Sequence, residues 1–250
     1  MHNPIIAALD VPDVAQAEEL VRKLAQLVGA FKVGSELFTR SGPDLVRRIR
    51  AAGAAVFLDL KFHDIPNTVA RAVANAVRLD VQMLTVHTSG GMDMLKAAEQ
   101  AAQETARGMQ EQPPLVLGVT VLTSMDSNAL SEIGLPGNVG RQVERLAVLA
   151  EKAGLRGLVC SPLEVVALRQ LLSSTMCLVT PGIRGKSDAS GDQKRTLSAP
   201  EALAAGADWL VVGRPIYAAS DPVGAVQALR ESIEEHRKTI PTTPVSRFRL

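Results

Sequence analysis

Hydrophobic runs and amphipathic stretches alternate along this chain from its first residues. Eight short runs are rich in Leu, Ile, Val or Ala and often end in a polar residue or glycine: PIIAALD, AFKVGS, AVFLDLK, QMLTVH, PLVLGVTVL, GLVCS, CLVTPG and WLVVGR. Runs of this length and composition predict β-strands. Because they are almost continuously apolar, both faces of each strand are expected to be buried, as in parallel sheets.

Longer segments with helical spacing of apolar residues lie between these runs. They cover Val14–Leu27, Pro43–Ala51, Thr68–Val77, Met94–Ala106, Arg141–Ala153, Pro162–Leu171 and Pro222–His236. Repeated strand–helix units in a chain of 250 residues predict an α/β fold, a single TIM (β/α)8 barrel over residues 1–236. An open, doubly wound parallel sheet is the alternative.

Two segments interrupt this rhythm. Ile183–Ser198 is longer than a usual connection and rich in Gly, Ser, Asp and basic residues, which favours a mobile functional loop. The tail at 237–250 contains two prolines and four basic residues but no acidic ones, and we expect it to be poorly ordered.

Composition excludes several classes of protein. Lys and Arg number 27 against 26 Asp and Glu, so the net charge of +1 offers no general attraction to nucleic acid or an anionic membrane. Aromatic residues make up only 3%, too few for base-stacking surfaces. Cys160 and Cys177 stand in apolar runs without metal-ligand spacing, which predicts buried thiols and no metal site. With neither a basic leader nor a long apolar segment, the chain is expected to be cytoplasmic.

Charged residues gather at the ends of the first strands, where barrels of this kind place their reactive groups. Strand 1 ends in Asp10, Lys32 lies in strand 2, Asp59 and Lys61 lie in strand 3, and Asp64 lies in the loop after it. Strand alternation sends Asp59 and Lys61 to the same face. Buried charges must compensate one another, so these residues predict an ionic network at the barrel mouth. The network could be catalytic, or the pair could be a salt bridge that only fills the barrel end.

Other residues predict a phosphate site near the ends of strands 7 and 8. Gly213 and Arg214 precede a helical turn after strand 8, a common phosphate-binding position in such barrels. Arg184 and Gln193, in the preceding loop, add a guanidinium and an amide that could bind the same dianion. Together they indicate a phosphorylated small molecule as ligand.

The motifs, taken in order, resemble the bacterial type of orotidine 5′-phosphate decarboxylase over about residues 4–236. They are ALD at Asp10, FKVG at Lys32, DLKFHDIPNT at Asp59–Thr68, LTS at Thr123, TPGIR at Arg184, GDQKR at Gln193 and VVGR at Arg214. One departure is Tyr217, where bacterial relatives more often carry a small hydroxyl residue; it lies in none of these motifs.

The resemblance implies a role for each matching residue. Lys32, Asp59, Lys61 and Asp64 would form the catalytic charge network, with Lys61 as proton donor and Asp64 reaching the neighbouring subunit's site. The expected substrate contacts are Asp10, Lys32, Asp59, Lys61, Asp64, Ile65, Thr68, Thr123, Pro181, Arg184, Gln193, Gly213 and Arg214. Asp10 and Thr68 would contact ribose hydroxyls, Thr123 the pyrimidine, and Arg184, Gln193 and Arg214 the phosphate. The implied protein is a homodimer with shared active sites that needs no cofactor and no metal.

Three other functions remain as alternatives. A sugar-phosphate decarboxylase or aldolase-like synthase on the same barrel would share a DxKxxD segment but require a divalent metal. Lys32 and the GDQ sequence argue against this alternative. A Schiff-base aldolase needs a neutral lysine, whereas carboxylates beside Lys61 favour the ammonium form. A non-catalytic phosphate-binding barrel is the third, because a fold and a phosphate site do not by themselves imply turnover.

Overall fold

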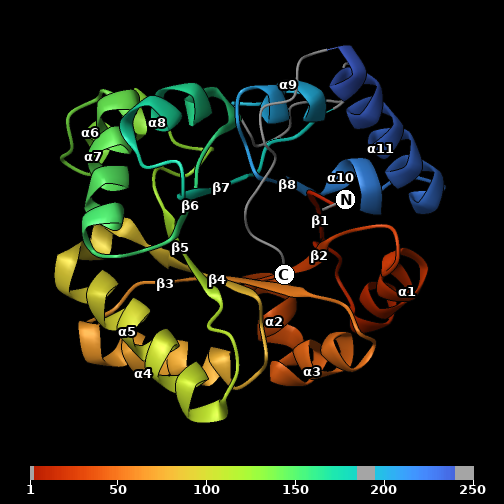
Figure 1. Cartoon of the computed structure of the whole chain (residues 1–250), viewed down its shortest axis with the longest axis horizontal. Coiled ribbons are helices and arrows are strands. Elements are labelled where there is room, and N and C mark those ends of the chain that lie inside the picture. Colours follow the sequence, from red (N-terminus) through yellow and green to blue (C-terminus); the bar gives the residue numbers. More distant parts are fainter. Residues whose placement is uncertain (1–2, 185–194, 240–250) are drawn as a thin grey trace.

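The computed structural model describes residues 3–184 and 195–239, and it forms a closed barrel of eight parallel strands surrounded by helices (Figure 1). Neighbouring strands follow the chain order, and β8 closes the ring by pairing with β1. The strands are β1 Ile5–Ala8, β2 Ala30–Gly34, β3 Val56–Phe62, β4 Met83–His87, β5 Leu115–Val119, β6 Gly157–Val159, β7 Cys177–Thr180 and β8 Trp209–Val212. The predicted barrel is therefore confirmed, and the open-sheet alternative is wrong.

Helices follow the strands and cover the outside of the barrel (Figure 1). The α-helices are α1 Val14–Leu24, α2 Ser35–Ser41, α3 Pro43–Ala51, α4 Pro66–Val77, α5 Gly91–Met109, α6 Ser127–Glu132, α7 Val139–Lys152, α8 Val165–Leu171, α9 Ala199–Ala204, α10 Arg214–Tyr217 and α11 Pro222–Thr239; the 3₁₀ helices are η1 Thr88–Gly90 and η2 Pro162–Glu164. The short helices α2 and α6 were not predicted, because six or seven residues are too few for a clear helical period. Helix α11 continues three residues beyond the predicted end of the barrel domain, and the rest of the predicted tail lies outside the described residues.

Two apolar layers hold the fold together. The larger one lies between the strands and the helices, and the smaller one fills the barrel itself with side chains such as Ile6, Phe57, Met83 and Trp209. Residues of one strand alternate between these layers, so the inward positions of a strand lie above one another along the barrel axis. Hydrophobic side chains occupy the inward positions nearer the amino ends of the strands, and polar groups can occupy inward positions nearer the carboxyl ends.

Three strands show how this alternation places the polar site. In β2 the inward residue after Ala30 is Lys32, in β3 the one after Phe57 is Asp59, and in β4 the one after Met83 is Thr85. Each of these polar residues is buried, and each lies nearer the carboxyl end of its strand than the hydrophobic inward residue before it. These three polar side chains therefore lie directly above the hydrophobic interior, at the barrel mouth.

Candidate functional site

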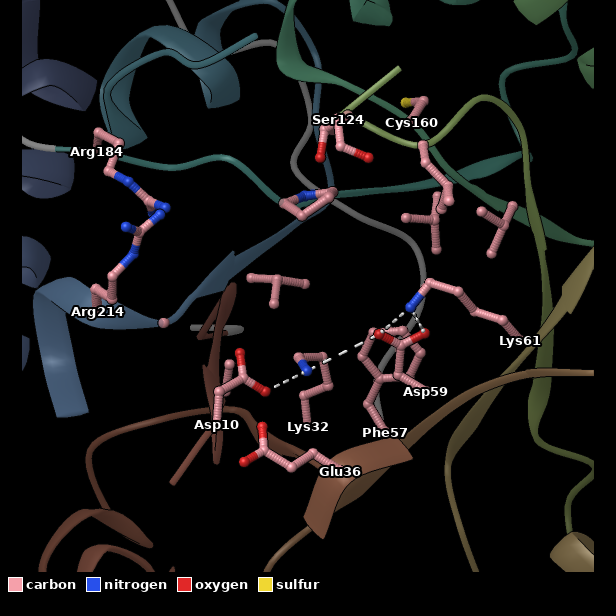
Figure 2. A pocket seen from close by; sticks show the side chains of 18 of the residues that line it. Asp10, Lys32, Glu36, Phe57, Asp59, Lys61, Ser124, Cys160, Arg184 and Arg214 are labelled. Carbon is pink, nitrogen blue, oxygen red and sulfur yellow. Dashed lines mark hydrogen bonds and ion pairs between the residues drawn. The ribbon is translucent and has the colours of Figure 1, made fainter. Parts of the chain in front are cut away.

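Four charged side chains form a row across the barrel mouth (Figure 2). Lys32 Nζ donates a hydrogen bond of 2.8 Å to Asp10 Oδ1 and lies 3.9 Å from Asp59 Oδ2. Lys61 Nζ lies 2.9 Å from both carboxylate oxygens of Asp59. Lys32 and Asp59 are each only 9% exposed. The signs alternate along the row, and this pairing offsets the cost of burying these charges.

The hydroxyl of Thr85 connects this row to the next strand. Its Oγ1 donates a hydrogen bond of 3.0 Å to Asp59 Oδ1 and accepts one of 2.8 Å from the backbone N–H of Lys61. Thr85 is fully buried in β4, where the pairing of Leu58 with Leu84 brings it beside Asp59. Thr85 was not among the predicted site residues, although a threonine at an inward position of an otherwise apolar strand was a usable signal.

The backbone at Lys61 departs from regular strand geometry. Its φ of 50° lies in the left-handed region, and the register of β3 with β4 shifts between Leu58 and Phe62. A non-glycine residue held in that region costs about 1–3 kcal/mol, and such strain is common at functional sites. The expected meeting of Asp59 and Lys61 is therefore present, but the strand is irregular at Lys61, where the sequence predicts regular alternation.

The row of charges forms one end of a cavity of about 480 Å³. Arg184 and Arg214 lie at another side of it, away from Lys61, and Figure 2 shows their side chains extending toward one another. A volume of this size is typical of sites for small molecules. The cavity lining also includes Glu36, Leu122, Ser124 and Cys160, none of which was among the predicted site residues.

The arginine side of the cavity contains the predicted phosphate-binding residues. Arg184 follows β7 and donates from Nη1 to the carbonyl oxygen of Ile183 at 2.8 Å, while Arg214 begins α10 directly after Gly213. A Cβ on Gly213 would lie 3.5 Å from the ring of Tyr217, which is an ordinary contact. Tyr217 lines the cavity. The residue that departs from the family pattern thus lies within the site, although it belongs to none of the motifs.

The remaining predicted site residues divide into three groups. Thr123 and Pro181 line the cavity, at the loops after β5 and β7. Asp64, Ile65 and Thr68 lie outside the lining, in an exposed stretch where α4 begins, and Ile65 is 66% exposed. Gln193 and most of the predicted mobile loop lie outside the described residues. The described chain therefore brings most of the predicted site residues around one cavity, whereas Asp64, Ile65 and Thr68 lie on its surface.

Two neighbouring groups have altered proton affinities. Burial, followed by the positive charges of His63 and Lys61, lowers the pKa of His87. Burial raises the pKa of the Cys160 thiol to about 12, and both Cys160 and Cys177 are free and buried, as predicted. Cys160 is thus a thiol at neutral pH, and it contributes an apolar surface to the cavity.

Residues 3–184 and 195–239 contain neither a candidate metal site nor a candidate membrane-spanning helix. Within these ranges, the His, Cys, Asp and Glu side chains form no group of three or more that could hold a metal ion. In the same part of the chain, no helix is long and apolar enough to cross a membrane.

The fold and the cavity together define a TIM-barrel protein with a site for a small anionic molecule, bounded by an ion-paired lysine–aspartate row and two arginines. The chain belongs to the orotidine 5′-phosphate decarboxylase / HUMPS family, whose model matches residues 3–229. This finding confirms the resemblance inferred from the motifs.

Individual relatives agree with this assignment. The chain is 52% identical over 229 residues to the orotidine 5′-phosphate decarboxylase of Syntrophotalea carbinolica, covering 92% of this chain and 94% of that relative. It is also 52% identical to the enzyme of the same name from Nitrosococcus oceani, covering 92% and 97% of the two chains. The crystal structure of orotidine 5′-phosphate decarboxylase from Lactobacillus acidophilus matches with a TM-score of 0.81 at 35% identity, covering 92% of this chain and 99% of that one.

Proposed function

We propose that this chain decarboxylates orotidine 5′-phosphate to uridine 5′-monophosphate (UMP) and carbon dioxide, the last step of pyrimidine nucleotide synthesis. Family membership and relatives of that name at about half identity support this activity. The single observation that carries the proposal is the cavity itself. It contains an ion-paired lysine row on one side and two arginines on another, which suits a substrate with a reacting carboxylate and a distant phosphate.

The chemistry explains why a fixed cation is needed. Loss of carbon dioxide from C6 of the pyrimidine leaves an electron pair in an orbital that no adjacent carbonyl can delocalise. The ammonium of Lys61 stabilises this charge and then donates a proton to C6. At an effective dielectric constant of about 20, one ion contact at about 4 Å contributes about 4 kcal/mol. That energy corresponds to about a thousandfold in rate.

Asp59 and Thr85 give that cation a fixed direction. Asp59 binds Lys61 with both carboxylate oxygens, and Thr85 holds the same carboxylate from the other side. Groups that are oriented before the reaction need no reorganisation when charge develops, which is the main source of electrostatic catalysis. In this proposal Asp59 also lies near the departing carboxylate, and Lys32 pairs with both Asp10 and Asp59.

The arginines would bind the phosphate. Arg184 and Arg214 can each form charge-assisted hydrogen bonds to a dianion, and Gly213 lines the cavity beside Arg214. The proposal includes Gln193 as a further ligand from outside the described residues. Because the phosphate does not react, its binding energy can be used to hold the pyrimidine against Lys61.

Completion of the site by a second subunit is also part of the proposal. Asp64, Ile65 and Thr68 are exposed at the start of α4. A homodimer would place them in the neighbouring cavity and bury Ile65. Mixing Lys61→Ala with Asp64→Ala chains tests this, since hybrid dimers would contain one intact site and restore about a quarter of wild-type activity. Mixtures as inactive as either variant alone would contradict shared sites.

A cytoplasmic location completes the proposal. The two cysteines are unpaired and buried in the described structure. Proteins with such thiols are typical of reducing compartments. Fractionation of the producing cell, with the activity recovered outside the cytoplasmic fraction, would contradict this location.

The decisive experiment measures carbon dioxide release from orotidine 5′-phosphate in chelator-treated buffer by wild type and Lys61→Ala. We expect rapid release by wild type and a loss of at least about a thousandfold in the variant, at unchanged Tm. A wild type without turnover would contradict the activity, and a Lys61→Ala variant within tenfold of wild type would contradict the mechanism. Activity that requires added divalent metal would favour the metal-dependent sugar-phosphate enzymes instead.

A further inference from the structure

The buried guanidinium of Arg195 joins three loops at the carboxyl side of the barrel. Arg195 lies in the connection between β7 and α9, and it forms an ion pair with Glu164 after β6. Its Nη2 donates to the carbonyl oxygens of Val121 at 3.2 Å and Leu122 at 3.0 Å, which follow β5. The side chains of Arg195 and Glu164 are only 15% and 10% exposed.

The carboxylate partner of Arg195 is itself firmly held. Glu164 Oε2 accepts a hydrogen bond of 2.9 Å from the backbone N–H of Ser161, and this is half of a capping box at the start of η2. Ser161 is fully buried. The guanidinium of Arg195 is therefore held in place by Glu164, and it can in turn hold the carbonyl groups that it binds.

Those carbonyl groups belong to a wall of the substrate cavity. Val121, Leu122, Thr123 and Ser124 all line it, yet they form neither helix nor strand. A segment without its own backbone hydrogen-bond ladder depends on outside partners for its position. Arg195 supplies such partners to two consecutive residues, and it is not itself among the residues that line the cavity.

We propose that Arg195 is a positioning residue, which fixes the wall at residues 121–124 so that Thr123 and Ser124 face the bound pyrimidine. This inference rests on the proposed function, because it assigns the wall to the pyrimidine of the substrate. Arginine suits the task because its planar fork binds a carboxylate and carbonyl groups at the same time. Lysine can retain the ion pair but cannot reproduce the whole set of bonds.

The chain offers a matched control at the opposite end of the barrel. Arg169 also pairs with a carboxylate, that of Asp208, and donates to two carbonyl oxygens, those of Gly206 and Met176. These partners precede β8 and β7. In barrels of this kind, the amino end of the strands serves stability and the carboxyl end serves catalysis. The two arginines therefore share their bonding pattern but differ in their distance from the cavity.

The experiment compares wild type, Arg195→Ala, Arg195→Lys and Arg169→Ala at a temperature well below each Tm. It measures kcat and KM for orotidine 5′-phosphate, the Kd for UMP by calorimetry, and Tm. A displacement of about 1 Å in a reacting arrangement can lower rates about 100-fold. We therefore expect kcat/KM to fall about 100-fold in Arg195→Ala and about tenfold in Arg195→Lys. We expect Arg195→Ala to weaken UMP binding as well, by about tenfold. Arg169→Ala should lower Tm by at least as much as Arg195→Ala, with kcat/KM and Kd within about threefold of wild type.

Each contrary outcome has its own meaning. Wild-type values of kcat/KM and Kd in Arg195→Ala would overturn the positioning role, as would equal losses in Arg169→Ala. Should Arg195→Ala fail to fold, Arg195→Lys decides, and wild-type kinetics in that variant would reject the proposal. Absence of turnover in wild type would contradict the proposed function, while the UMP affinities of the same variants would still test Arg195.

Discussion

Thr85 Oγ1 donates a hydrogen bond of 3.0 Å to Asp59 Oδ1, and the same oxygen accepts the backbone N–H of Lys61 at 2.8 Å. One buried hydroxyl therefore fixes both the carboxylate that binds the proposed proton donor and the strained backbone from which that donor extends. Positioning of Lys61 thus depends on a residue of the neighbouring strand.

Thr85→Val should lower both stability and turnover. The valine has nearly the same shape, but it leaves the Lys61 N–H without its acceptor and removes the hydrogen bond to the Asp59 carboxylate. A hydrogen bond to a charged group contributes about 1.5–3 kcal/mol. We expect kcat to fall about tenfold, while KM changes less than threefold. Steady-state kinetics and urea unfolding measure these effects. Thr85→Ser should retain the activity, and Thr120→Val, which removes a buried hydroxyl outside the cavity, should leave kcat unchanged.

Gly34→Ala should disturb Lys32 without damaging the fold. The φ of Gly34 is −91°, which alanine adopts readily, but its Cβ would lie 3.1 Å from Lys32 Nζ and 3.6 Å from Asp10 Oδ1. The flexible end of the lysine can move aside, so we expect an unchanged Tm and a loss of about tenfold in kcat/KM. Gly108→Ala is the control, because no atom lies within 4 Å of that Cβ. Equal kinetics for both variants would contradict a functional role for the position of Lys32.

Arg184→Ala and Arg214→Ala should weaken catalysis only for a phosphorylated substrate. A hydrogen bond between charged groups contributes about 1.5–3 kcal/mol, so each variant should lose about 10- to 100-fold in kcat/KM for orotidine 5′-phosphate. With orotidine, which has no phosphate, the variants and wild type should be equal within threefold. A similar loss with both substrates would place these arginines away from the phosphate. Arg141→Ala, at an exposed position of α7, serves as the surface control.

His87 should make the protein less stable in mild acid. Burial lowers its pKa from the ordinary value of 6.5, so below that pH the unfolded chain binds a proton that the folded chain does not. Stability is therefore complete above 6.5 and falls as the pH decreases toward the lowered pKa. Urea unfolding at pH 7.5 and about pH 5.5 should show a smaller decrease for His87→Gln than for wild type. Equal decreases would contradict the role of His87, and His63→Gln provides the comparison at the exposed ring 5.6 Å away.

Most of the architecture could be predicted from the sequence because its signals are local. All eight strands lie where the apolar runs predicted them, although β1 ends at Ala8, two residues before Asp10. Helices α2 and α6 were missed because they are short, and their sequences show no clear helical period of apolar residues. Closure of the sheet was predicted from the repeated strand–helix units, with an open sheet as the alternative, and the pairing of β1 with β8 confirms it.

The candidate site divides in the same way. Its charged residues were found because a charge in an apolar strand is conspicuous wherever its partner lies. Glu36 and Ser124 were not found, because a surface glutamate and a loop serine carry no such signal. Thr85 was not found either, although its inward position in an apolar strand was a usable signal. Arg195 was hidden for a similar reason, since its partners lie 31 and about 73 residues away in the chain.

By itself, the sequence determined the order of strands and helices, the family, and the list of ionisable groups at the strand ends. These follow from residue types and short spacings, which the unfolded chain already contains. Only the tertiary structure excluded the open sheet, showed the irregular backbone from which Lys61 meets Asp59, and placed the two arginines in the same cavity. Those features depend on contacts between distant strands, and such contacts exist only once the barrel has formed.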